Sequence, residues 1–326
     1  MTNEKSQVVL RGVNGTSVLS AVQQCLERCE WQSWVPSGAT VVLKPNVCTA
    51  VAKIVDVANT SVEVTAAACE VLRTRARKIY IVEANHMRET AWQAFEASGY
   101  VEMAKRLDVE LVNLSEQPLA PVHCDPVGPI ALWPPMLECD AFITLPVLKT
   151  HALTYFTGSL KNQWGCVPNY QDRIYHHTKI NQLLPTLHRI LKPKLSLMDA
   201  TTAMEGRGPV AGQRRRMDLI LASRDGIALD VSAMRLVGLD PQRCRHVMLA
   251  AKQGLGRTRP EEIEIDGDWG RFATKFEAPP VDVANRAMFY LGRYPWFVKN
   301  ILANDKLYYP VANFVKMLRR AKVLGG

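Results

Sequence analysis

Short runs of apolar and β-branched residues recur along the chain, each bounded by turn residues or by a helical pattern. The runs occupy Val8–Val13, Val41–Leu43, Ile79–Val82, Val109–Leu114, Ala141–Val147, Leu195–Met198 and Leu219–Ala222. Continuous apolar runs of this length are typical of strands that are buried on both faces of a sheet. The pattern therefore predicts a sheet that is covered on both sides.

Longer stretches with helical periodicity separate these runs. They are Ser17–Cys29, Ser61–Arg73, Ala91–Leu107, Lys179–Leu191 and Ile227–Val237. Alternation of buried strands with helices predicts an α/β fold, with a mainly parallel sheet and helices on both faces. We expect two stretches to fall outside this scheme: Pro118–Pro135 as an irregular excursion or small lobe, and Glu261–Asp268 as a surface connection.

The composition is that of an intracellular globular protein. The chain has 326 residues, 48% of them hydrophobic, and no apolar run of about 18 residues that would suggest a membrane span. Its first residues lack the order of a secretory signal, so we expect a cytoplasmic location. The eight cysteines form no C-x2-C pair, so the sequence has no motif for an intrinsic iron–sulfur cluster.

The net charge of +9 is concentrated in the last 43 residues. Ala284–Gly326 holds eight Lys and Arg residues against the single acid Asp305, which leaves +2 for residues 1–283. We therefore divide the chain into an α/β catalytic domain, 1–283, and a basic, aromatic-rich helical tail, 284–326. Aromatic and basic residues together are typical of a segment that docks on its own domain, binds a protein partner, or lies peripherally on a membrane surface. We do not expect nucleic-acid binding, because no recognition motif accompanies the charge.

Polar side chains follow several of the predicted strands. Lys44 and Asn46 come after the second run, Glu83 after the third, and Asp199 after the sixth. In open parallel sheets, ligands bind outside the carboxyl ends of the strands, so these groups are candidates for one site. Polar residues also end strands simply because solvent begins there. Convergence from several strands favours the functional interpretation.

The segment from Lys149 to Lys179 is rich in cations that no nearby acid neutralises. Its only acid is Asp172, whereas an ordinary charged helix surface mixes acids with bases. A small carboxylate or phosphate ligand would supply the missing negative charge. Hydroxyl and backbone N–H groups near Gly158 could bind the same anion, although no Walker or dinucleotide-binding glycine motif is present.

Two sets of candidate residues follow. The candidate catalytic groups are Lys149, His151, Lys161, His176 and Glu83, and the candidate substrate-binding groups are Lys44, Asn46, Thr157, Ser159, Asn162, Arg173, Asp199 and Glu205. Histidine, or a desolvated lysine, can exchange protons near neutral pH. His176 and the adjacent His177 point in different directions, so at most one of them should face a given ligand. A metal ion remains open, since His151, Asp199 and Glu205 are ligand types without a fixed spacing.

Several of these residues lie in motifs that resemble the domain of unknown function 362 family. The motifs are Lys44-Pro45-Asn46, Lys149-x-His151, Thr157-Gly158-x-x-Lys161-Asn162-x-x-Gly165, Arg173-x-x-His176, Asp199, Met204-Glu205-Gly206-x-Gly208-Pro209-x-x-Gly212, Ser223-x-Asp225 and Asp230. They cover roughly residues 8–256. Some members of the family are fused to ferredoxin-like modules, so the resemblance implies a link to redox metabolism. This chain lacks the cysteines for such a cluster.

Three functions are consistent with these observations. The first is an enzyme that acts on a small anionic metabolite through Lys/His acid–base groups, with the oxidoreductase link that the resemblance implies. The second is an isomerase or lyase that removes a proton next to a carboxyl or carbonyl group. The third is a protein that binds an anionic ligand or cofactor without turnover.

Overall fold

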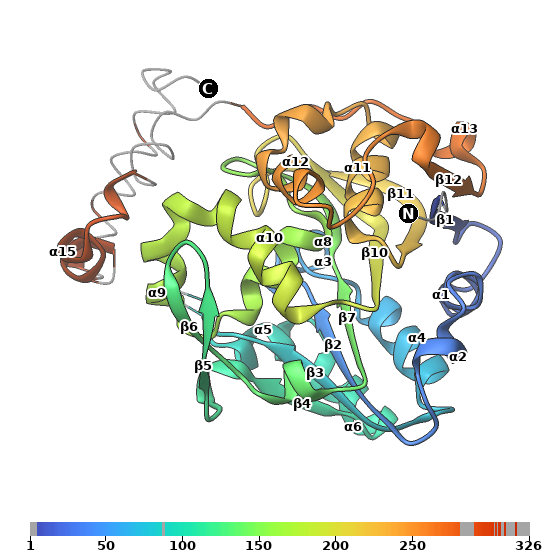
Figure 1. Cartoon of the computed structure of the whole chain (residues 1–326), viewed down its shortest axis with the longest axis horizontal. Helices are drawn as coiled ribbons and strands as arrows, with labels where there is room; N and C mark the ends of the chain where they lie inside the picture. Colours follow the sequence, from blue (N-terminus) through green and yellow to red (C-terminus); the bar gives the residue numbers. More distant parts are fainter. Residues whose placement is uncertain are drawn as a thin grey trace.

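The central element is a ten-stranded sheet that runs through the middle of the molecule (Figure 1). The structure is a computed structural model that describes residues 5–86, 89–280 and 290–302, and the single positions 304, 306, 307, 310 and 317. The strand order is β12-β1-β11-β10-β7-β2-β3-β4, and β8 pairs with β10 and with β9. The strands of this sheet are β1 (Ser6–Gly12), β2 (Ala39–Pro45), β3 (Ala76–Glu83), β4 (Glu110–Asn113), β7 (Ala141–Leu145), β8 (Val147–His151), β9 (Tyr155–Phe156), β10 (Leu195–Glu205), β11 (Gln213–Ser223) and β12 (Ile263–Asp266).

The sheet is mainly parallel, as the sequence predicts. Strands β2, β3, β4, β7 and the start of β10 run in one direction. Strand β11 is antiparallel to both β10 and β1, and β1 is parallel to β12. The carboxyl ends of β2, β3 and β7 therefore lie at the same edge.

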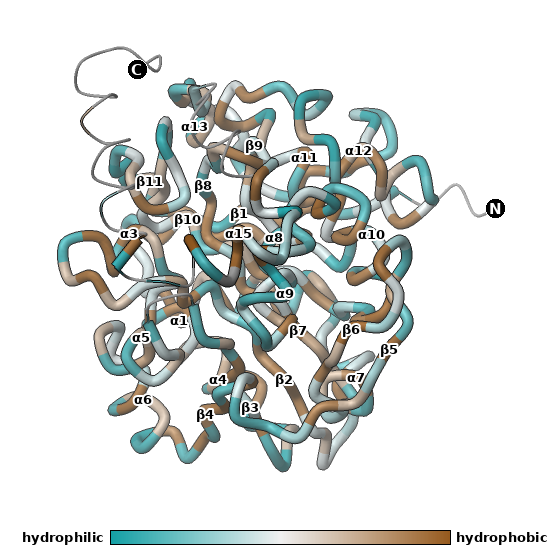
Figure 2. Tube along the Cα trace, turned by 90° about the vertical axis from the view of Figure 1, so that its left-hand side faces the viewer, coloured by the Kyte–Doolittle hydropathy of each residue, from teal (hydrophilic) through white to brown (hydrophobic). Residues whose placement is uncertain are grey.

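Alternate residues of each strand face two separate layers of helices. Val9 and Leu43 belong to the core on one side, and Val8 and Val42 belong to cores on the other. The first side is covered by α1 (Val18–Arg28), α4 (Val62–Leu72), α5 (Ala91–Ala97) and α6 (Tyr100–Leu107), and the other by α10 (Ile180–Leu191), α11 (Gly226–Leu236) and α12 (Arg245–Lys252) (Figure 1). Hydrophobic segments run along the strands and polar ones along the outer turns (Figure 2).

Several helices begin where the sequence supplies a capping side chain. Ser17 Oγ accepts a hydrogen bond from the backbone of α1, and Thr90 forms a capping box with Gln93 at the start of α5. The predicted helix Ala91–Leu107 is broken in two at Gly99, whose φ of +76° ends one helix and starts the next. The shorter helices are α2 (Trp31–Trp34), α3 (Val55–Ala58), α7 (Pro135–Glu138), α8 (Gly158–Asn162), α9 (Tyr170–Tyr175), α13 (Trp269–Phe272) and α15 (Pro295–Phe297).

Both stretches expected to fall outside the alternation of strands and helices contain strands. The stretch Pro118–Pro135 contains an antiparallel hairpin of β5 (Ala120–Cys124) and β6 (Gly128–Leu132), so the prediction of an irregular excursion is wrong there. The stretch Glu261–Asp268 contains β12, so the prediction of a surface connection is also wrong. Strand β12 exists because its backbone pairs with β1, a partner far away in the sequence.

Only part of the basic tail is described. The boundary predicted at 283/284 lies outside the described residues, as does most of the predicted helical tail, so the division into two domains stays a prediction. In the described part, α15 leads into the π-helical turn η6 (Val298–Leu302), which lies against α9. No helix in the described ranges is both long and apolar enough to cross a membrane.

Candidate active site

A cavity of about 290 Å³ lies at the carboxyl ends of β2, β3 and β8. Helices α8 and α9 and the loop after β10 complete its wall. Its lining consists of Lys44, Asn46, Cys48, Glu83, His86, Lys149, His151, Thr157, Lys161, Asn162, Trp164, Gly165, Tyr170, Arg173, Ile174, His177, Pro209 and Val210. Among these residues are four Lys or Arg side chains and one carboxylate, which makes the cavity strongly cationic.

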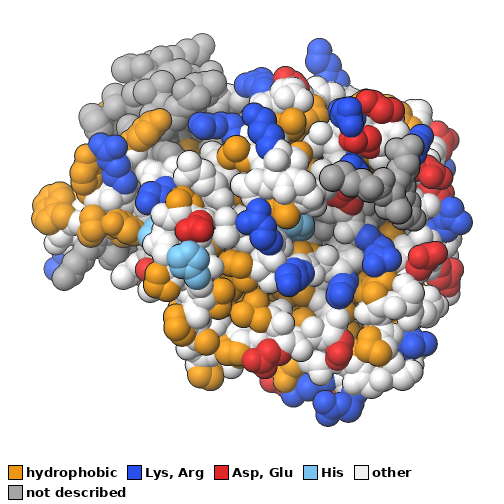
Figure 3. Space-filling view, viewed as in Figure 1, with side chains coloured by type: hydrophobic (Ala, Val, Ile, Leu, Met, Phe, Trp, Pro, Cys, Tyr) orange, Lys and Arg blue, Asp and Glu red, His pale blue; other side chains and the backbone are white. Residues whose placement is uncertain are grey.

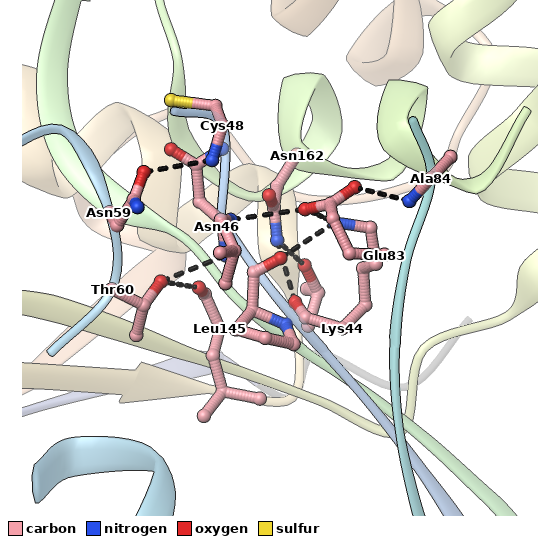
Figure 4. A network of polar contacts seen from close by, with 12 residues as sticks. Lys44, Asn46, Cys48, Asn59, Thr60, Glu83, Ala84, Leu145 and Asn162 are labelled. Atoms are coloured by element: carbon pink, nitrogen blue, oxygen red, sulfur yellow. Dashed lines mark hydrogen bonds and ion pairs between the residues drawn. The ribbon is translucent and has the colours of Figure 1, made fainter. Parts of the chain in front are cut away.

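Lys44 and Glu83 form an ion pair at the floor of the cavity (Figure 4). Lys44 Nζ donates to Glu83 Oε2 at 2.7 Å and to the Pro45 carbonyl at 2.6 Å, and both side chains are buried. Glu83 Oε2 also accepts from the Val47 N–H at 3.0 Å, and Oε1 accepts from the Ala84 N–H at 2.9 Å. Because donors occupy both oxygens, Glu83 is placed to hold Lys44 and the strand ends together.

Two glycines let the backbone approach this floor closely. Gly165 lies in the 3-10 helix η2 (Gln163–Cys166), and a Cβ there would be 2.8 Å from Glu83 Oε1 and 2.9 Å from Lys44 Nζ. Gly158, with φ +60°, starts α8, and a Cβ there would be 2.3 Å from Asp230 Oδ1. Any larger residue at either position would displace a wall of the cavity.

Asp230 fixes the start of α8 from behind the cavity. Its Oδ1 accepts from the Ser159 N–H at 2.6 Å, and its Oδ2 accepts from the Leu160 N–H at 3.2 Å. Complete burial raises the pKa of Asp230 to about 7. The arrangement sets the orientation of α8, which carries Lys161 and Asn162 on the cavity side.

Three of the four cations have no carboxylate partner. Lys149 is 1% exposed, and its Nζ donates to the Ala58 carbonyl at 2.6 Å and to Cys48 Sγ at 3.4 Å. The buried Arg173 donates through Nη2 to the Asn85 carbonyl. Within the described part of the chain, no acid forms an ion pair with Lys149, Lys161 or Arg173. Buried cations without counterions are costly, so an anion in this cavity would be favourable.

Lys161 is the cation whose proton is held most weakly. Burial, together with the nearby charges of Lys149 and Arg173, lowers the pKa of Lys161 to about 7. No residue in the described ranges accepts a hydrogen bond from its ammonium group. The neutral amine form of Lys161 is therefore accessible near neutral pH.

His151 is held as a neutral ring. Its Nδ1 lies 3.1 Å from the Leu153 N–H and 3.3 Å from the Thr154 N–H, and it must accept from both. The ring proton therefore resides on Nε2, which makes His151 a donor and not a base. Burial and then the charge of Lys161 lower the pKa of His151 well below its usual range.

Two further histidines border the cavity. Burial lowers the pKa of His86 to about 4, and its Nε2 lies 3.3 Å from the Val47 carbonyl. Burial, followed by the charges of Lys161 and Arg173, lowers the pKa of His177 to about 3. The ring of His177 packs edge-on against Trp164, with their centroids 6.2 Å apart. Both rings are thus neutral at physiological pH.

Several buried polar atoms of the lining lack a partner among the described residues. They are Asn46 Oδ1, Thr157 Oγ1, Asn162 Oδ1 and Trp164 Nε1. Thr157 and Asn162 are each 3% exposed, and Trp164 is 6% exposed. The Nδ2 of Asn162 is occupied by the Lys44 carbonyl and by Thr144 Oγ1, each at 2.8 Å. Buried polar atoms are normally satisfied, so these atoms indicate a place for a polar ligand or water.

The cavity brings together nine of the thirteen residues predicted from the sequence. They are Lys44, Asn46, Glu83, Lys149, His151, Thr157, Lys161, Asn162 and Arg173. Their assembly shows that strand ends and the Lys149–His177 segment share one site.

The other four predicted residues lie elsewhere. Asp199 is buried and accepts from the Ser61 N–H at 2.7 Å and from Thr201 Oγ1 at 2.6 Å. Glu205 accepts from the Glu277 N–H at 2.9 Å. Ser159 N–H donates to Asp230, and His176 packs against Tyr175 with ring centroids 4.9 Å apart. None of these four side chains lines the cavity.

Other lining residues were not among the candidates. Cys48 follows Lys44-Pro45-Asn46 by two residues, and Trp164 and Tyr170 flank Gly165 and Arg173 in the sequence. Their closeness in the sequence to candidate residues is the signal that could have identified them. Val210 comes from the loop after β10, and only the fold brings it here. In the described ranges, no group of three or more His, Cys, Asp and Glu side chains is placed to hold a metal ion.

A family described as a domain of unknown function (DUF362) matches residues 41–235, which is more than half of the chain. The chain belongs to the domain of unknown function 362 family. The matched region contains every residue of the cavity lining. It leaves out β1 and β12, which complete the sheet.

One curated relative and two solved structures are similar to the chain. A thylakoid-associated protein of Synechocystis sp. is 28% identical over 252 residues, which cover 75% of this chain and 78% of that protein. The lactate racemase apoprotein of Thermoanaerobacterium thermosaccharolyticum is 11% identical, with a TM-score of 0.47 over 87% of this chain and 89% of the other. A protein of Thermotoga maritima is 14% identical, with a TM-score of 0.38 over 72% of this chain and 59% of the other. Both structures are distant likenesses of the fold.

Proposed function

We propose that the cavity binds a small carboxylate- or phosphate-bearing metabolite and that Lys161 transfers a proton to or from it. The observation that carries the proposal is the excess of cations: Lys44, Lys149, Lys161 and Arg173 face one carboxylate, Glu83, which Lys44 already occupies. A bound anion would supply the missing countercharge in a place where solvent screens little. It would also accept a hydrogen bond from the Thr157 hydroxyl, which has no partner among the described residues.

The volume supports a small ligand. A liquid water molecule occupies about 30 Å³, so a cavity of 290 Å³ has room for a metabolite of roughly ten non-hydrogen atoms. The expectation that the globular part meets a small anion thus has support in both charge and size.

The site has the parts needed for proton abstraction next to a carboxyl or carbonyl group. Lys161 with a pKa of about 7 provides a base at neutral pH. The Nε2–H of His151 and the ammonium of Lys149 are donors that would stabilise the negative charge as it develops on the substrate oxygen. This combination favours isomerase or lyase chemistry. The oxidoreductase link stays a prediction that rests on the family resemblance.

Calorimetric titration with inorganic phosphate and a panel of small carboxylates tests the binding. We expect Lys161→Met and Lys149→Met each to weaken binding by roughly tenfold or more. Lys78→Met is the matched control, because Lys78 is an exposed lysine on β3 that pairs with Glu110 away from the cavity. Equal affinities in all four proteins would contradict the proposal.

Deuterium exchange separates catalysis from simple capture. Carboxylates that bind should incorporate solvent deuterium at the carbon next to the carboxyl group with the wild-type protein, and not with Lys161→Met. Binding without exchange in either protein would leave the anion site intact and contradict the role of Lys161 as a base. The third function, a non-catalytic carrier, would then describe the protein.

A second proposal concerns location: we infer that the basic tail contacts an anionic membrane surface. The relative from Synechocystis is named for its association with thylakoids. Tyr290, Tyr294 and Trp296 are 60%, 48% and 67% exposed, and Arg293 lies among them. Exposed hydrophobic side chains gather with Lys and Arg at this edge of the molecule (Figure 3). Aromatic rings beside basic groups suit a membrane interface.

Vesicle flotation tests this proposal. The full chain should float with vesicles of anionic phospholipid and less with neutral ones, and a chain without Ala284–Gly326 should remain in the dense fraction. Trp296→Ser should reduce flotation without changing the melting temperature, because the side chain is exposed. If the deletion lowers the melting temperature and leaves flotation unchanged, the tail docks on the domain instead.

A further inference from the structure

Cys48 is the one cysteine of the described chain that lines the cavity. Burial in apolar surroundings raises the pKa of the thiols of Cys25, Cys29, Cys69, Cys124, Cys139, Cys166 and Cys244. All of these thiols except Cys139 are buried, and buried thiols of this kind are typically inert. Cys48 and Cys139 are partly exposed, and Cys48 differs from Cys139 because it borders a cationic cavity.

The sulfur of Cys48 lies among groups that can assist a nucleophile. Lys149 Nζ donates to Cys48 Sγ at 3.4 Å. Cys48 is among the groups that affect the pKa of Lys161, so the two side chains are near one another. A thiolate is the reactive form of cysteine. Lys161, as a neutral amine near pH 7, is able to take the thiol proton.

The loop that carries Cys48 is held firmly in place (Figure 4). Asn59 Oδ1 accepts from the Cys48 N–H at 2.8 Å and from the Thr49 N–H at 3.2 Å, and Asn59 Nδ2 donates to the Thr49 carbonyl at 2.7 Å. A nucleophile on a fixed loop needs no rearrangement before it attacks. The position of the sulfur is thus set by the fold.

Two polar side chains independently indicate a place for a polar ligand in the cavity that Cys48 borders. Thr157 Oγ1 and Asn162 Oδ1 line this cavity, each in a side chain that is 3% exposed, and neither atom has a partner among the described residues. Together with Lys149, the Thr157 hydroxyl could donate to the oxygens of a small carboxylate, and Asn162 Oδ1 could accept from a hydroxyl group of the same ligand. The carbon next to that carboxylate would then lie within reach of the Cys48 sulfur.

We propose that Cys48 is a nucleophile that adds to a carbonyl carbon of a small carboxylate bound in this cavity. In this step a sulfur–carbon bond forms and the carbon–oxygen π bond breaks. The thiol proton passes to Lys161, the electron pair moves to the carbonyl oxygen, and Lys161 then returns the proton to that oxygen. The step needs no further oxidant or reductant. It rests on the proposed anion binding, because the cations bring the carboxylate to the sulfur.

Alkylation with two iodo reagents tests the proposal on the full-length protein. Iodoacetate is an anion that mimics a small carboxylate, whereas iodoacetamide is neutral and nearly the same size. Labelling of each cysteine is followed by peptide mass spectrometry, with glutathione as the reference for the intrinsic ratio of the two rates. Cys139 is the internal control, because it is partly exposed and lies outside the cavity.

We expect the ratio of iodoacetate to iodoacetamide labelling at Cys48 to exceed that of glutathione by roughly tenfold. Lys149→Met and millimolar phosphate should each reduce this excess. A ratio at Cys48 equal to that of glutathione would overturn the inference, as would labelling of Cys139 with none at Cys48.

Phosphate titration of the wild type and of Cys48→Ser distinguishes this inference from the function proposed above. Phosphate binding in both proteins, with no iodoacetate preference at Cys48, refutes the nucleophile alone. Absence of phosphate binding in the wild type refutes the anion site, and the inference fails with it.

Discussion

Replacing Glu83 by Gln should destabilise the protein strongly without affecting any exposed surface. The buried Lys44 ammonium would lose a carboxylate that lies 2.7 Å away. At an effective dielectric constant of about 20, two unit charges at that separation interact by about 6 kcal/mol. Removing one partner of a buried pair typically costs about 3–5 kcal/mol, because the other charge remains buried. We expect a loss of unfolding free energy in that range.

Urea unfolding followed by far-UV circular dichroism measures the effect. The control is Glu110→Gln, which breaks the exposed pair of Lys78 and Glu110, 2.9 Å apart, and should cost less than about 1 kcal/mol. The double variant Lys44→Met with Glu83→Gln should be less destabilised than the sum of its single variants, by at least about 1 kcal/mol. Binding of phosphate to folded Glu83→Gln should survive, because the cation excess increases.

Two results would refute this reasoning. If Glu83→Gln unfolds within about 1 kcal/mol of the wild type, the pair does not stabilise the strand ends. If the variant is stable but no longer exchanges deuterium into bound carboxylates, Glu83 takes part in the chemistry, as the sequence suggests. Its carboxylate would then have a role beyond holding Lys44 and the strand ends together.

Three other predictions follow from the cavity. The folded pKa of Lys161 lies below its ordinary value of 10.5, so the unfolded chain binds this proton more readily between about pH 7 and 10.5, and the free energy of unfolding of the wild type rises with pH across that window. Urea unfolding at several pH values should show that Lys161→Met flattens this rise. An unchanged slope would contradict the lowered pKa of Lys161. His151→Asn keeps an acceptor for the Thr154 N–H but removes the Nε2 donor, so phosphate affinity measured by calorimetry should fall roughly tenfold while the melting temperature changes little; unchanged affinity would show that the ring does not face the ligand. Gly158→Ala would place a Cβ 2.3 Å from Asp230 Oδ1. The control is Gly254→Ala, because Gly254 also has a left-handed backbone conformation but has open space around it. Gly158→Ala should lower the free energy of unfolding by at least about 2 kcal/mol more than Gly254→Ala, and equal losses would refute the close contact.

Much of the sheet could be predicted because its strands carry consecutive apolar residues. Val41, Val42 and Leu43 face the two helical layers in alternation, so all three positions have to be apolar. The resulting continuous apolar run identifies the strand. Strand β12, with the sequence Ile-Glu-Ile-Asp, lies at an edge and carries acids. Only its pairing with β1 makes it a strand, and a local pattern does not contain that information.

The site could be predicted in part for a similar reason. The cations of the Lys149–His177 segment stand out because Asp172 is the only acid among them. All nine predicted residues that meet in the cavity are hydrogen-bonding or charged groups at strand ends or in that segment, and Glu83 pairs with Lys44. Asp199 does not line the cavity because β10 continues for eleven residues, so the strand does not end at Asp199. Glu205 does end β10, but its carboxylate accepts from the Glu277 N–H. The side chain of Asp199 instead binds the Ser61 N–H at the start of α4. The sequence does not show which way a strand-end side chain turns.

The pairing of β1 between β11 and β12 has a consequence for any attempt to produce the family region alone. A fragment cut at residues 41 and 235 would lack β1, leaving Leu219, Ile220 and Leu221 on a bare sheet edge. Exposed apolar edge strands pair with other chains, so such a fragment should aggregate although it holds the whole cavity. The limits of sequence similarity therefore differ from the limits of a usable recombinant protein, which should begin before Ser6 and extend beyond Asp266.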